Sequence, residues 1–156
     1  MKEQRLSSLL DLAIAREEDA YAFYRDLQGK MTDRTARDTL DFLAKEEQKH
    51  REFLIRYKKG ELPSGTMRFA DAVDYHVAEH EKEPDPKTAA GDLKDLFLIA
   101  AHRELRAHDF YVALAKAHPE GPVRDMLLMM ASQEMKHKEK VEYLYANAAF
   151  PQTAGG

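Results

Sequence analysis

Two Glu-x-x-His pairs are the residues of this sequence best suited to chemistry, Glu47 with His50 and Glu134 with His137. Residues three positions apart share one face of an α-helix, so the carboxylate and the imidazole of a pair can reach the same ion. Both pairs lie on stripes of apolar residues with helical periodicity, which are expected to face a core. The spacing therefore predicts two buried groups of metal ligands.

The two pairs belong to an internal repeat with a constant offset of 87 residues, as from Glu47 to Glu134. The segment AIAREEDAYAFYRDL at 13–27 aligns without a gap on AAHRELRAHDFYVAL at 100–114. The segment FLAKEEQKH at 42–50 aligns in the same way on MMASQEMKH at 129–137. The chain therefore uses one helical hairpin twice, and a site on the pseudo-twofold axis between the halves would be built in matched pairs.

The repeat also selects among neighbouring carboxylates near the first histidine. Glu46 and Glu47 are both close to His50, but Glu46 corresponds to Gln133, whereas Glu47 corresponds to Glu134. Only Glu47 therefore keeps its carboxylate in both halves.

The same comparison applies to the helix that precedes each pair. Glu17 corresponds to Glu104, whereas its neighbour Glu18 corresponds to Leu105. The candidate metal ligands are Glu17, Glu47, His50, Glu104, Glu134 and His137.

Four carboxylates that converge in one dry core would repel one another, and a buried unpaired charge costs several kcal/mol. Two divalent cations would neutralise them. Ligand sets rich in carboxylate with a single imidazole per ion favour Fe or Mn, and Zn also accepts His and Glu. The alternative is polar pairing within a helical bundle that binds no metal.

Four segments with helical periodicity position these residues, at about 2–28, 33–59, 89–117 and 122–147. Asp33 is a candidate N-cap, and Pro122 suits a first helical turn. The links inside each hairpin are short, so their helices should be antiparallel neighbours.

The connection between the hairpins, residues 60–88, is long and contains FADAVDYHVAEH, which could form a short extra helix. An all-α, ferritin-like four-helix bundle with one long crossover is the predicted fold. We expect one di-metal domain over 1–150, with repeat halves at about 3–59 and 89–147, followed by a flexible tail at 151–156.

The motifs AIAREEDAYAFY, EEQKH, HRELRAHDFY and QEMKH resemble the rubrerythrin-type branch of the ferritin-like superfamily. The resemblance implies a di-iron centre that reduces hydrogen peroxide or oxygen. It implies that Glu47 and Glu134 bridge the ions and that the other two glutamates are terminal. The resemblance also implies two sets of ligands. Glu17 and Glu134 form one set with His137, and Glu104 and Glu47 form the other with His50.

Tyr24 and Tyr111 follow Glu17 and Glu104 by seven residues on the same stripes. Each could be a core aromatic residue with its hydroxyl satisfied. Each could instead orient a ligating carboxylate from the other half or pass an electron to the site. The resemblance matches them to the tyrosines that lie just outside the metal ligands in the family.

Two departures from the family's pattern, and a comparison with bacterioferritin, shape the expected function. The chain has no cysteine and thus no rubredoxin-like domain, so an external protein should donate electrons. Ala107 and its mate Ala20 replace an additional carboxylate, which makes the site resemble the symmetric ferroxidase centre of bacterioferritin. Gln48 stands where the haem-ligating methionine of bacterioferritin would fall, so no haem is expected.

We therefore expect a non-haem enzyme with two Fe ions per chain, acting on peroxide or oxygen. The alternatives are a ferroxidase that stores or delivers iron, and a metal-stabilised interaction protein without enzymatic activity. A net charge of −4 with no basic patch does not favour nucleic-acid binding. The absence of a run of ~20 apolar residues or a signal sequence predicts a cytoplasmic protein that binds no membrane. A homodimer or larger oligomer is expected.

Overall fold

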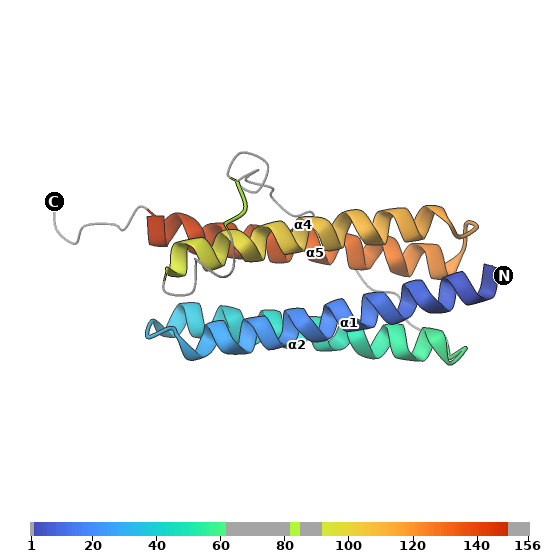
Figure 1. Cartoon of the computed structure of the whole chain (residues 1–156), viewed down its shortest axis with the longest axis horizontal. Helices are drawn as coiled ribbons and strands as arrows, with labels where there is room; N and C mark the ends of the chain where they lie inside the picture. The colour runs from blue at the N-terminus through green and yellow to red at the C-terminus, as the bar shows by residue number, and fades with distance from the viewer. Residues whose placement is uncertain (1, 62–81, 85–91, 150–156) are drawn as a thin grey trace, which may run out of the picture. The chain divides into compact units, whose positions relative to one another are not determined.

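A computed structural model describes residues 2–61, 82–84 and 92–149 of the chain. These residues form four long helices: α1 (Lys2–Gly29), α2 (Arg34–Lys58), α4 (Leu93–Lys116) and α5 (Pro122–Ala149) (Figure 1). The described part of the chain contains no β-strand. The prediction of an all-α fold with four long helices is therefore confirmed.

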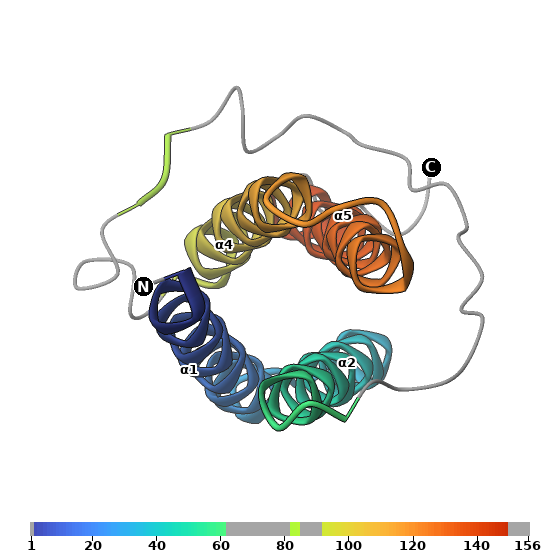
Figure 2. The same ribbon diagram turned by 90° about the vertical axis from the view of Figure 1, so that its right-hand side faces the viewer.

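The helices form two antiparallel hairpins, in which α1 packs on α2 and α4 packs on α5 (Figures 1 and 2). The chain divides into two compact units, Met1–Thr66 and Met67–Gly156, and each unit contains one hairpin. Each unit thus contains one of the two repeat halves, and the predicted single domain over 1–150 stays a prediction. The predicted extra helix and the predicted tail lie outside the described residues.

The helix ends follow local capping chemistry. The carboxylate of Asp33 accepts a hydrogen bond from the backbone N–H of Ala36 at 2.9 Å, so this predicted N-cap is confirmed. Pro122 is the first residue of α5, also as predicted. The helix α4 begins at Leu93 rather than near residue 89, because Asp92 is extended and accepts from Lys94 N–H at 3.0 Å.

Ion pairs on the surface connect the helices of the first hairpin. Arg25 on α1 contacts Asp41 on α2 at 2.6 Å, which lowers the pKa of the Asp41 carboxyl and raises that of the guanidinium. Lys58 contacts Asp11 at the other end of the hairpin. Exposed pairs of this kind contribute little free energy, so the apolar core provides most of the packing energy.

A short piece of the crossover contacts the second hairpin. The guanidinium of Arg106 on α4 donates to both carboxylate oxygens of Glu83, at 2.6 and 3.1 Å. This bidentate contact lowers the pKa of Glu83, and His102 and Arg103 act in the same direction. Glu83 is therefore held on the face of α4 that carries these basic side chains.

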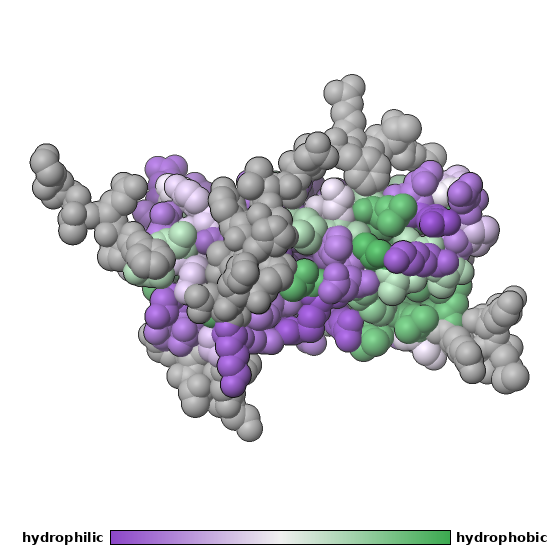
Figure 3. Space-filling model, turned by 90° about the horizontal axis from the view of Figure 1, so that it is seen from above, coloured by the Kyte–Doolittle hydropathy of each residue, from purple (hydrophilic) through white to green (hydrophobic). Residues whose placement is uncertain are grey.

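The two halves differ in burial although their sequences repeat. Leu9 and Leu12 on α1 are 39% and 43% exposed, whereas their mates Leu96 and Ile99 on α4 are buried. Figure 3 shows one face of the molecule, on which apolar side chains gather toward one end among hydrophilic ones. No helix within the described ranges combines the length and the apolar character needed to cross a membrane.

Candidate metal centre

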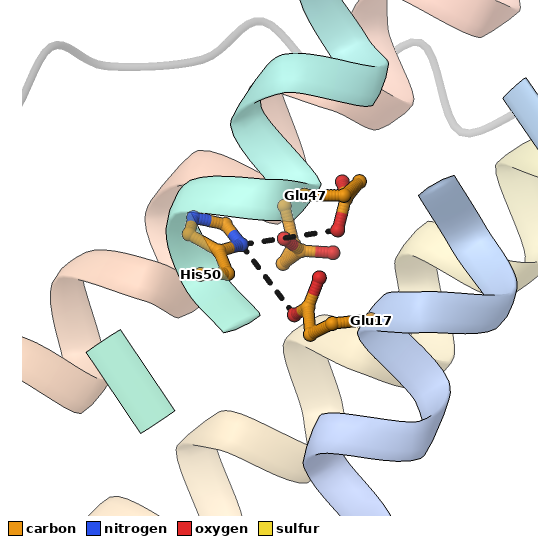
Figure 4. A group of neighbouring side chains, drawn as sticks. Glu17, Glu47 and His50 are labelled. Atoms are coloured by element: carbon orange, nitrogen blue, oxygen red, sulfur yellow. Dashed lines mark ion pairs between the residues drawn. The ribbon is translucent and has the colours of Figure 1, made fainter. Parts of the chain in front are cut away.

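The first hairpin brings three of the predicted ligands together in its core. Glu17 lies on α1, and Glu47 and His50 lie on α2, and all three are at least 97% buried. The Nδ1 atom of His50 is 3.5 Å from Oε1 of Glu17 and 3.8 Å from Oε2 of Glu47 (Figure 4). One possible ligand atom from each residue lies within 4.8 Å of the others. We refer to these three residues as the first half-site.

The second hairpin repeats this arrangement. The Nδ1 atom of His137 on α5 is 3.7 Å from Oε2 of Glu104 on α4 and 3.7 Å from Oε1 of Glu134. These three side chains are also nearly fully buried. They form the second half-site, and the agreement between the halves extends to the choice of the imidazole nitrogen that faces the carboxylates.

The donor chemistry of each half-site fits a divalent cation. Two carboxylates and one imidazole converge in an interior where charge is poorly solvated, so the carboxylates repel each other and each carries a desolvation cost. A divalent ion would offset two negative charges per half-site. Oxygen and imidazole ligands without thiolate are suited to Fe, Mn or Zn. Each half-site is therefore a buried Glu/His cluster that could bind metal.

The structure corrects the grouping implied by the resemblance. That grouping placed Glu17 with His137 and Glu104 with His50. The structure instead groups Glu17 with His50 and Glu104 with His137, each within a single hairpin. The reason is the antiparallel register, which brings the central glutamate of one helix level with the Glu-x-x-His pair of its direct neighbour.

The carboxylates that the repeat rejects lie outside both half-sites. The carboxylate of Glu46 is 3.8 Å from the ammonium of Lys49, on the same helix. The carboxylate of Glu18 accepts from Nε of Arg51 at 2.7 Å, and both side chains of this pair are 40% exposed or more. Their surroundings agree with the repeat-based selection of Glu47 and Glu17.

Replacing Glu46 by alanine should leave metal binding unchanged, because its carboxylate contacts Lys49 and belongs to neither Glu/His cluster of the described residues. The free energy of unfolding should change by less than about 1 kcal/mol, because the ion pair that is lost is partly solvated. Metal analysis of the purified variant and thermal unfolding check both expectations. Loss of metal from Glu46→Ala would show that this carboxylate belongs to the site.

Tyr24 and Tyr111 are both 2% exposed and lie in the hairpin cores. Each ring makes an edge contact with the preceding phenylalanine, Phe23 or Phe110, with centroid distances of 5.7 and 5.5 Å. Seven residues span about 10 Å along a helix, so each tyrosine lies about two turns from the glutamate of its own helix. Their burial and aromatic packing are consistent with tyrosines that serve as core residues. That they orient a ligating carboxylate or pass an electron to the site stays a prediction.

One buried ion pair, on the same helix as Glu134 and His137, was not predicted from the sequence. Lys138 and Glu142 on α5 are 0% and 1% exposed, and Nζ of Lys138 is 3.2 Å from Oε2 of Glu142. The only available signal was their spacing, because Lys138 and Glu142 follow Glu134 by four and eight residues on one helix face.

The fold and the site together define an all-α protein built from two similar helical hairpins. Each hairpin carries a buried Glu/His cluster that could bind metal. The sequence model of the rubrerythrin family, described as Rubrerythrin, matches residues 1–58, which are the first hairpin. The first hairpin is thus similar in sequence to the rubrerythrin family, as its motifs predicted. The second hairpin is connected to this match by the internal repeat. No curated protein and no solved structure matches the chain significantly.

Proposed function

We propose that this protein is a non-haem di-iron oxidoreductase that reacts with hydrogen peroxide or oxygen. The observation that carries the proposal is the duplicated half-site, in which two carboxylates and one imidazole converge at full burial. The family match supports iron as the metal. One ion per half-site gives two Fe ions per chain, and Mn or Zn would suit the same ligands.

The side chains of each half-site would act as ligands through defined atoms. His50 and His137 turn Nδ1 toward the carboxylates, so Nδ1 is the nitrogen that would bind metal. Three protein ligands leave coordination positions open for an external oxygen species. When bound, two ferrous ions would supply the two electrons that, together with two protons from solvent, reduce one hydrogen peroxide to two waters.

Burial of these ligands limits access of bulk water to the reaction. Tyr24 and Tyr111 are the buried tyrosines of the described residues, and they lie on α1 and α4, which also carry Glu17 and Glu104. We assign them a supporting role, either orienting a carboxylate or passing an electron. The re-reduction of the site would come from a separate electron-donor protein, because this chain contains no cysteine to hold a redox cluster. We further propose a homo-oligomeric, cytoplasmic protein.

Anaerobic loading with Fe(II) followed by stopped-flow mixing with peroxide tests the reaction. The protein-bound iron should be oxidised at least about tenfold faster than Fe(II) in the same buffer, which is a difference of about 1.4 kcal/mol in the barrier. One peroxide should be consumed for every two Fe(II) oxidised. A rate equal to that in buffer would remove the peroxidase proposal and leave the metal site standing.

Ferroxidase activity with iron storage or delivery is the second candidate. The supporting observation is that Ala20 and Ala107 occupy matched positions, so both halves lack the additional carboxylate expected of a peroxidase-type centre. Storage needs a shell of many subunits. The mass of the native assembly by size-exclusion chromatography with light scattering separates the candidates, because a 24-mer favours storage and a dimer opposes it.

A further inference from the structure

The buried ion pair Lys138–Glu142 makes the two half-sites electrostatically different. Lys138 directly follows the ligand His137, and Arg51 occupies the equivalent place after His50. Arg51 reaches the surface and contacts Glu18 on α1, where water screens both charges. Lys138 instead stays in the interior and contacts a carboxylate on its own helix.

Lys138 is the one lysine or arginine among the buried side chains of the described residues. The buried acidic and histidine side chains in the same part of the chain are Glu17, Glu47, His50, Glu104, Glu134, His137 and Glu142. A cationic side chain is rarely buried unless it is paired, and a buried pair often stabilises no better than apolar residues of similar size. Stability alone therefore gives a weak reason for this pair.

The orientation of the pair gives a stronger reason. Lys138 lies four residues after the ligand Glu134, and Glu142 lies eight residues after it, on the same helix face. Along the helix axis these spacings are about 6 and about 12 Å. The lysine of the pair therefore lies about one helical turn from Glu134, and its carboxylate partner lies about one turn further along the helix.

A positive charge in this position acts on both states of the site. In the metal-free protein it attracts the carboxylates and offsets part of their repulsion. In the metal-bound protein it repels the cation. Glu142 offsets part of both effects, but burial leaves the remainder less screened than at the surface. The first half-site has no equivalent, because Ile55 stands where Glu142 stands in the second half and Arg51 is solvated.

We propose that Lys138 is an internal counter-cation of the second half-site, which stabilises its metal-free carboxylates and weakens its affinity for metal. This inference rests on the proposed metal-binding function. It makes the two half-sites unequal although their ligands are the same, so the first half-site fills before the second. Lys138 acts here through the charge of the ligands and is not itself a ligand.

Calorimetric titration with Fe(II) under anaerobic conditions tests the proposal on the full chain. Lys138→Gln should tighten the weaker binding step by about fivefold or more, which is the low end of usual coupling between sites. Glu142→Gln should weaken the same step by a similar factor, because it leaves the positive charge without its partner. Opposite changes in Fe(II) affinity in the two variants would indicate an electrostatic effect. If the ion pair only supported the local packing, both variants should bind Fe(II) more weakly.

The equivalent exposed pair provides the matched control. Arg51→Gln and Glu18→Gln should each change Fe(II) affinity by less than about twofold, because solvent screens both charges. If circular dichroism shows that either single variant of the buried pair is unfolded, the double variant Lys138→Gln/Glu142→Gln tests the proposal instead. It carries neither charge and should bind the second Fe(II) more tightly than the natural protein.

The outcomes separate this inference from the proposed function. If the natural protein binds no Fe(II), the metal site itself is refuted and the inference falls with it. If the natural protein binds Fe(II) but the Lys138 and Glu142 variants show unchanged or uniformly weaker binding, only the counter-cation role is overturned.

Discussion

Replacing Glu47 by alanine should remove metal from the first half-site and, at the same time, stabilise the metal-free protein. The carboxylate of Glu47 is 1% exposed and lies 3.8 Å from Nδ1 of His50, so it is positioned as a direct ligand. Its loss should reduce affinity by more than the roughly 10- to 100-fold typical of losing an outer hydrogen-bond partner. Without metal, the variant holds one buried negative charge fewer, which should raise the free energy of unfolding by about 1 kcal/mol.

Two measurements together check this prediction. Metal analysis after anaerobic Fe(II) loading should give about one ion fewer per chain, and thermal unfolding in chelator should show a higher midpoint than the natural protein. The neighbouring variant Glu46→Ala is the matched control, because it removes the same carboxylate one residue away and outside the cluster. Glu134→Ala should behave as Glu47→Ala does. Retention of both ions in either ligand variant would refute the ligand assignment.

The contrast between Glu46 and Glu47 shows why this site could be predicted from sequence. Local spacing alone allows both carboxylates, and burial cannot be read directly from the sequence. The repeat supplies the missing information, because two halves of one design must place the same residue types at the same depth. The structure places Glu47 in the cluster and Glu46 beside Lys49, in agreement with that argument.

The pairing of residues between the two helices of a hairpin could also be predicted from the sequence. The ligand sets implied by the family resemblance did not take this pairing into account. Glu17 lies 12 residues before the end of α1 at Gly29 (29 − 17), and Glu47 lies 13 residues after the start of α2 at Arg34 (47 − 34). Helices joined by a short turn are antiparallel, so residues at nearly the same distance from the turn lie side by side along the helix axes. This count predicts that Glu17 meets the Glu47–His50 pair of its own hairpin.

The buried pair at Lys138 and the start of α4 could not be derived in the same way. In the repeat, Lys138 aligns with Arg51 and looks like an ordinary basic residue on a solvated face. Its burial depends on packing between segments distant in sequence, which periodicity does not report. The start of α4 depends on Asp92, whose capping role competes with the helical preference of Ala89 and Ala90 before it.

Removing metal should cost this protein much of its thermal stability, because each hairpin core then holds two buried carboxylates without the cation that would offset their mutual repulsion. Ligand present at 1,000 times its dissociation constant stabilises the folded state by about 4 kcal/mol per site. For a chain of this size, 1 kcal/mol shifts the unfolding midpoint by about 2–4 °C. Metal in both half-sites should therefore raise the midpoint of thermal unfolding by about 15–30 °C. Chelation should reverse nearly all of this increase.

Differential scanning calorimetry of the Fe(II)-loaded protein, of the same sample after chelation and of the reloaded sample measures this shift. The double variant Glu47→Ala/Glu134→Ala serves as the control, because it lacks a ligand in each half-site and its midpoint should not respond to chelator. A natural protein whose midpoint is equally insensitive would mean that the four carboxylates are accommodated without metal. The buried clusters would then be polar pairing in a helical scaffold, since no divalent cation would be needed to offset their charge.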